Sequence, residues 1–125
     1  MLERDNIVYS KGKKFALQII GLYKGLIADK KIYVLANQIL RSGTSIGANI
    51  AESRNAQSAS DFISKLNIAL KEADETLYWL DLLNESKEIS PEQYETLEKD
   101  CREMIGLLVA IIKSKKRNEG VRIEN

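Results

Sequence analysis

The sequence contains no histidine, one cysteine and one proline among its 125 residues. The missing histidine removes the usual general base at neutral pH, the commonest metal ligand and the partner in Ser-His and Cys-His nucleophile pairs. Cys101 has no second cysteine with which to form an internal disulfide. We therefore expect a protein that is not an enzyme and that has no catalytic residue, metal site or cofactor.

Long apolar runs are also absent. The longest uninterrupted run, residues 107–112, is far shorter than the roughly 20 residues that cross a bilayer. Residues 1–10 are largely polar and charged, and they lack the apolar region of a signal peptide. The sequence therefore predicts a cytoplasmic protein with no membrane-spanning segment.

The net charge is only +1, but the charges are segregated along the chain. Residues 1–60 carry nine basic and four acidic side chains, residues 61–100 carry four and eleven, and residues 101–125 carry six and three. Both ends are thus basic, and the third quarter is acidic. Such a chain can keep a basic surface despite its near-neutral total.

Apolar residues recur with helical spacing in four segments, at about 11–28, 30–56, 60–85 and from residue 91 onward. The last segment has the clearest start, because Ser90, Pro91 and Gln93 form an S-P-x-Q capping box. Short connections make successive helices antiparallel neighbours. The pattern therefore predicts an all-α, antiparallel up-down-up-down four-helix bundle over residues 11–116, with flexible tails at 1–10 and 117–125.

The third segment has apolar residues on two sides. Counted at about 100° per residue from Leu66, the outer side holds Ile68, Trp79 and Leu82. An aligned apolar outer face indicates a protein contact, so we expect a homo-oligomer interface there. The alternative is a helix tilted so that both of its sides are covered within one chain.

The second segment carries small residues at intervals of four, Gly43 and Gly47 among them. A helical glycine costs about 1 kcal/mol relative to alanine, so close helix packing must compensate. We include both glycines in the expected oligomer interface.

Polar residues also follow the second segment. Buried hydroxyl and amide groups require hydrogen-bond partners, and carboxylates of the third segment are candidate acceptors. We predict a structural network whose members are Ser42, Ser45, Asn49, Glu72 and Glu75. The alternative is a functional polar site.

Basic side chains gather where the first helix is expected to start and where the fourth is expected to end. In an antiparallel bundle these two ends share a pole, so the charges add into one cluster that attracts phosphates in a salt-dependent way. The alternative is that they only confer solubility. The cluster comprises Lys11, Lys13, Lys14, Lys113, Lys115, Lys116 and Arg117.

The second segment contains the pattern R-x-x-x-S-I-x-x-N-I-A-E. Its residues are Arg41, Ser45, Ile46, Asn49, Ile50, Ala51 and Glu52, and the third segment adds Phe62, Ala69, Glu72 and Glu75. Over residues 11–115 the chain resembles the four-helix bundle proteins related to those encoded in intervening sequences of 23S ribosomal RNA genes. This resemblance implies an antiparallel bundle that assembles into a homopentameric ring.

The resemblance extends more distantly to accessory proteins of diversity-generating retroelements, which bind nucleic acid and a reverse transcriptase. It adds Arg41 and Arg54, the basic residues near the motif, to the candidate nucleic-acid contacts. We expect a non-enzymatic scaffold that binds RNA or DNA, with a reverse transcriptase or another protein as a further partner. The alternative is a protein adaptor that uses the acidic third segment and binds no nucleic acid.

Overall fold

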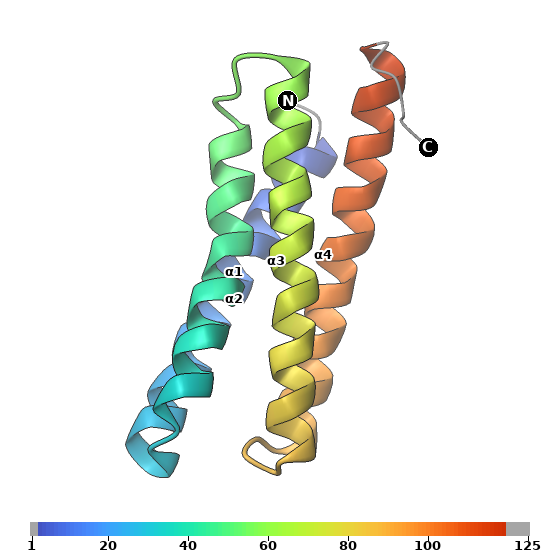
Figure 1. Cartoon of the computed structure of the whole chain (residues 1–125). Coiled ribbons are helices and arrows are strands. Elements are labelled where there is room, and N and C mark those ends of the chain that lie inside the picture. Colours follow the sequence, from blue (N-terminus) through green and yellow to red (C-terminus); the bar gives the residue numbers. More distant parts are fainter. Residues whose placement is uncertain (1–2, 120–125) are drawn as a thin grey trace.

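The structure is a computed structural model of the chain, and it describes residues 3–119. Within these residues the elements are four α-helices and one π-helical turn: α1 (Glu3–Gly25), η1 (Leu26–Lys30), α2 (Tyr33–Ser53), α3 (Ala59–Glu85) and α4 (Pro91–Asn118). The chain reverses direction between successive helices, so α1 begins and α4 ends at the same end of the molecule (Figure 1). The prediction of an all-α fold with four helices is confirmed.

The core lies along the bundle axis, where the apolar stripes of the four helices meet. α1 packs against α2 and α4, and α3 packs against the same two helices. Phe15, Ile46, Leu66 and Leu108 are each at most 1% exposed, one from each helix. Helices whose apolar residues recur at three and four positions can bury that stripe only by packing together, which is what forms the bundle.

The flexible tail expected at residues 1–10 is wrong for the part that the structure describes. α1 begins at Glu3, and Val8 is only 2% exposed. Val8 lies seven residues before Phe15, so it extends the same stripe by two turns. At the other end α4 runs to Asn118, and most of the tail expected at 117–125 lies outside the described residues.

One end of the bundle, which we call the closed pole, holds residues 26–32 and 86–90. Its first connection is the π-helical turn, followed by Lys31 in the left-handed region with φ of 56°. This left-handed residue breaks the helical path, so α2 begins at Tyr33 and not at residue 30 as expected.

The second connection of the closed pole ends α3 in a Schellman motif. Lys87 adopts φ of 63°, its N–H donates to the carbonyl of Asn84 at 3.0 Å, and the N–H of Glu88 donates to that of Leu83 at 2.9 Å. The capping box predicted for α4 then follows, with both of its hydrogen bonds present. Local hydrogen bonds therefore satisfy backbone groups at the end of α3 and at the start of α4.

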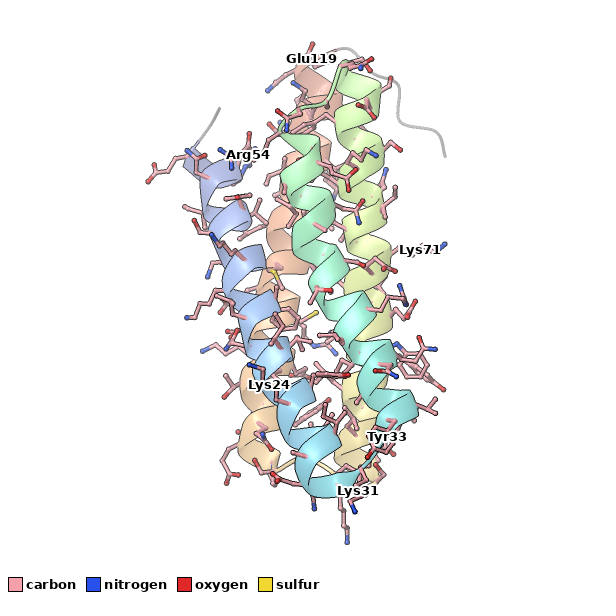
Figure 2. All side chains as sticks on the ribbon, turned by 90° about the vertical axis from the view of Figure 1, so that its left-hand side faces the viewer. Lys24, Lys31, Tyr33, Arg54, Lys71 and Glu119 are labelled. Atoms are coloured by element: carbon pink, nitrogen blue, oxygen red, sulfur yellow. The ribbon has the colours of Figure 1, made fainter. Side chains whose placement is uncertain are left out.

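The opposite end, which we call the open pole, holds the start of α1, the connection 54–58 and the end of α4. Ser58 caps α3 by accepting from the N–H of Asp61 at 3.0 Å. The ends of all four helices surround a cleft of about 500 Å³ here. In Figure 2 the upper end of α1 lies apart from α2, with Arg54 between them.

The small residues of α2 serve a contact within the chain. A Cβ on Gly47 would lie 2.9 Å from the carbonyl oxygen of Gly12 in α1, and one on Gly43 would lie 2.8 Å from the side chain of Ile19. The assignment of these two glycines to the oligomer interface is therefore wrong, because α1 occupies that side of α2. Close packing does compensate for their low helix propensity, as expected.

Candidate nucleic-acid interface

The seven basic residues expected at one pole lie in two groups. Lys11 pairs with Glu103 at 3.3 Å, which places this part of α1 level with the middle of α4. Lys115 lies twelve residues further along α4, or about 18 Å at 1.5 Å per residue. The single cluster is wrong because α1 begins at Glu3, so Lys11, Lys13 and Lys14 lie in its third turn and beyond.

The C-terminal group remains at the open pole. Lys113 and Arg117 are exposed, and Lys116 is half-buried. Lys115 pairs with Glu119 at 3.1 Å, and its Nζ lies 5.2 Å from the ring centroid of Phe62 in α3. The last turn of α4 is therefore strongly basic, and these cations also compensate the negative end of its helix dipole.

Arg54 joins this group from the end of α2. Its side chain is exposed, and the guanidinium carbon lies 4.1 Å from the ring centroid of Tyr9 in α1, a cation–π contact. Arg4 lines the same cleft. Our sequence analysis missed Arg4 because it treated residues 1–10 as a tail, although the spacing of Val8 from Phe15 was a signal for helix.

Arg41 lies elsewhere and is engaged within the chain. Its guanidinium donates to Oε2 of Glu72 at 2.8 Å and to Oε2 of Glu75, so it joins α2 to α3. Trp79 Nε1 donates to the same Glu75 oxygen at 2.9 Å. The hydrogen bond from Trp79 and the pairing with Arg41 lower the pKa of Glu75, and the bond to Glu75 raises the pKa of Arg41. We therefore remove Arg41 from the candidate interface.

The predicted polar network separates into individual bonds, one between helices and the others within them. The hydroxyls of Ser42 and Thr76 lie 2.9 Å apart in the core, and Thr76 Oγ1 lies 2.8 Å from its own helix's carbonyl at Glu72. Asn49 Nδ2 donates to the carbonyl of Ser45 at 2.9 Å. Ser42 therefore does have a partner on α3, but that partner is the hydroxyl of Thr76 and not a carboxylate. The expected single network is wrong because the Asn49 amide bonds one turn back on its own helix, while the two glutamates bind Arg41.

The outer side of α3 is only partly exposed. Ile68 is 41% exposed, but Trp79 and Leu82 are half-buried, and Trp79 packs against the core. Trp79 also meets the 57% exposed Tyr78 edge-on at 5.1 Å. The tilted-helix alternative therefore accounts for Trp79. Other apolar side chains are exposed that were not predicted to be, among them Leu17, Tyr33, Val34 and Tyr78.

The acidic side of α3 is largely occupied by partners within the chain. Glu72 and Glu75 bind Arg41, and Asp81 accepts from the hydroxyl of Tyr94 at 2.6 Å, which raises the pKa of Tyr94. These bonds leave fewer free carboxylates for a basic partner, which weighs against the adaptor alternative.

Cys101 is buried in α4, and its Sγ lies 3.5 Å from the carbonyl of Ala73. Burial raises the pKa of this thiol to about 12, so it stays protonated at neutral pH. A buried thiol of this kind is a core residue and a poor nucleophile.

Residues 3–119 contain neither a membrane-spanning helix nor a cluster of metal-ligating side chains. No helix in this range is both long enough and apolar enough to cross a bilayer. The same residues contain no group of three Cys, Asp or Glu side chains arranged to hold a metal ion.

The sequence and fold of the chain can be compared with known proteins. The model of the family described as 23S rRNA-intervening sequence protein matches residues 4–110. A crystal structure from Bacteroides thetaiotaomicron VPI-5482, described as a protein with unknown function from the S23 ribosomal protein family, is 55% identical with a TM-score of 0.87. The match covers 88% of this chain and 98% of that chain. No curated protein sequence matches. The chain belongs to the family of 23S rRNA-intervening sequence proteins.

Proposed function

We propose that this antiparallel four-helix bundle assembles into a homopentameric ring in the cytoplasm and acts as a non-enzymatic scaffold that binds RNA or DNA electrostatically. The observation that carries the proposal is the concentration of cations at the open pole. They come from two helices, α1 and α4, and from the connection after α2, and they are Arg4, Arg54, Lys113, Lys115, Lys116 and Arg117. A ring repeats this pole in every subunit, so a strand that contacts several subunits gains avidity.

Most of these cations are free to meet phosphates. No acidic side chain within residues 3–119 forms an ion pair with Arg54, Lys113, Lys116 or Arg117. Exposed cations that contact phosphates release the counterions condensed on nucleic acid, which makes the binding favourable at low salt. Arg41 contrasts with them, because its two glutamates already neutralise it.

Assembly is supported by exposed apolar side chains on three helices. In a homo-oligomer, the surface of another copy of the chain can cover such side chains. The most exposed are Leu17 at 62% on α1, Val34 at 76% and Tyr33 at 56% on α2, and Tyr78 at 57% on α3.

Light scattering of the purified chain, alone and with single-stranded RNA or DNA, tests assembly and nucleic-acid binding in one experiment. We expect a mass of about five chains that takes up nucleic acid at about 50 mM salt and releases it by about 200 mM, as counterion release requires. A ring indifferent to nucleic acid at both salt concentrations contradicts nucleic-acid binding and favours the protein adaptor. A monomer contradicts the scaffold.

A pair of variants with equal loss of charge locates the interface. Lys113→Gln, Lys116→Gln and Arg117→Gln together remove three charges from the open pole, and we expect at least about tenfold weaker RNA binding with a salt slope smaller by about 2–3. The control removes three charges from the closed pole through Lys24→Gln, Lys30→Gln and Lys31→Gln. Equal weakening by both triples would show that binding follows net charge and not the open pole.

A further inference from the structure

The open pole contains a cleft to whose wall each helix end contributes. Arg4 and Asp5 come from α1, Arg54 follows α2, Phe62 belongs to α3 and Lys115 to α4. Its volume of about 500 Å³ lies within the range of about 300–1,000 Å³ that is usual for small-ligand sites. A side-chain-lined cleft at the junction of four helix ends can hold a compact ligand.

The charges of the cleft favour an anion. Arg4, Arg54 and Lys115 contribute three positive charges, against the carboxylates of Asp5 and Glu119. Glu119 lies at the rim, paired with Lys115 at 3.1 Å. Lys113, Lys116 and Arg117 follow on the same end of α4 and add to the positive potential around the opening.

The cleft also has an aromatic and apolar side. Phe62 and Ile111 line it together. The ammonium of Lys115 lies 5.2 Å from the Phe62 ring centroid. The guanidinium of Arg54 lies 4.1 Å from the ring centroid of Tyr9, which is outside the cleft wall and holds Arg54 in place at its edge. Cations beside aromatic rings are typical of sites that hold a phosphate and a base together.

Two polar atoms of the wall lack partners. Arg4 Nε and Asp5 Oδ1 are buried without a hydrogen bond to any residue of the range 3–119. Buried polar atoms normally have a partner, so a donor and an acceptor that adjoin on α1 and lack one call for an explanation. Both atoms belong to side chains that line the cleft, so a ligand that carries an anionic acceptor and a neutral N–H donor would supply both bonds if these side chains turned toward it.

We infer that the cleft binds one nucleotide unit, either free or at the 5′ end of a single strand. Its phosphate lies among Arg4, Arg54 and Lys115, its base packs on Phe62, and an exocyclic amine of the base donates to Asp5, as cytosine N4 does to carboxylates elsewhere. The inference deepens the proposed nucleic-acid binding, on which it rests. It turns a diffuse basic surface into a defined site.

Fluorescence anisotropy with the full-length chain tests the inference, using 3′-labelled pentacytidylate RNA with and without a 5′-phosphate. At moderate salt we expect the 5′-phosphate to tighten binding about tenfold, because it adds a charge-assisted contact to two cations. Arg54→Gln with Lys115→Gln should abolish that difference. Phosphorylated pentauridylate, which lacks the exocyclic amine, should bind about threefold more weakly than the cytidylate.

The control variant removes two exposed charges away from the cleft, Lys24→Gln and Lys71→Gln, and should keep the tenfold effect of the 5′-phosphate (Figure 2). Circular dichroism checks that both variants keep their helices. Competition by cytidine monophosphate identifies a site for free nucleotides, and its absence beside a 5′-phosphate effect identifies a strand-end site. Equal binding of pentacytidylate with and without the 5′-phosphate overturns the inference. Failure to bind either of these two RNAs at low salt overturns the proposed function.

Discussion

The two poles of the bundle are built differently. The closed pole holds two chain connections, and two left-handed lysines and a capping box satisfy its backbone polar groups locally. Ile89, only 7% exposed, fills its interior, and the hollow between the two connections measures about 140 Å³. A wider hollow of about 410 Å³ adjoins it on the side of α1 and α4, away from the connections. The open pole holds one connection and a cleft of about 500 Å³ that charged side chains line.

The difference follows from the topology. Four helices that alternate in direction have two connections at one end, whereas the other end has one connection and the two chain ends. Two tight connections draw the helices of the closed pole together. At the open pole α1 and α4 are not joined, so side chains determine what lies between them. The connections of the closed pole therefore hold the helices together, and the open pole is the end at which we propose that a ligand binds.

The largest expected effect on stability comes from the contact between α1 and α2. Gly47→Ala would place a Cβ 2.9 Å from the backbone oxygen of Gly12, which cannot move as a side-chain end can. We expect a loss of about 2–3 kcal/mol in the free energy of unfolding, measured in urea, because overpacking forces the backbone apart. This change would widen the open pole by displacing the upper part of α1.

The matched control for Gly47 is Gly106 on α4, where an added Cβ would meet nothing within 4 Å. Gly106→Ala should stabilise the chain by about 0.5–1 kcal/mol through helix propensity alone. If both substitutions stabilise, α1 does not depend on the close approach to α2.

The same substitution at both poles separates stability from binding. Ser90 caps α4 at the closed pole and Ser58 caps α3 at the open pole, and either serine changed to alanine should cost about 1 kcal/mol in thermal or urea unfolding. Only Ser58→Ala should also weaken RNA binding, because Ser58 lines the cleft. Weaker RNA binding by Ser90→Ala at a temperature where it is folded would contradict the division of roles.

The smallest expected effect is a gain at the closed pole. Lys87→Gly should raise the free energy of unfolding by about 0.5–1 kcal/mol, because glycine adopts the left-handed region without the Cβ clash. Lys24, in the right-handed last turn of α1, is the control, and Lys24→Gly should destabilise the chain instead. A loss of stability in Lys87→Gly would mean that its side chain contributes more than its backbone costs.

Several features could be predicted because neighbouring residues determine them. Ser90, Pro91 and Gln93 fix the start of α4 through their own hydrogen bonds, and the stripe that includes Leu66 identifies the buried side of α3. The start of α1 was predictable too, since Val8 continues the spacing of Phe15. The polar residues around Val8 made residues 1–10 resemble a tail. The prediction therefore placed Lys11 at the end of the bundle, whereas it lies in the third turn of α1.

Other features depend on which helix lies opposite. Arg41 has the residue type of a phosphate contact, yet two glutamates of α3 hold it, and the distance of 31 positions between Arg41 and Glu72 leaves no local signal. Gly47 marks a close approach, but its spacing does not say whether the partner is α1 or another subunit.

The sequence by itself determined four helical segments, the cap of α4 and the buried faces, because these follow from interactions within a few residues. Only the tertiary structure decided that Arg4, Arg54 and Lys115 share one cleft with Phe62, while Lys11 pairs with Glu103. Glu103 precedes Lys115 on α4 by twelve residues, or about 18 Å at 1.5 Å per residue. The reason is that helix register and packing are set by the whole core. Side chains far apart in the chain meet only after those helices are aligned.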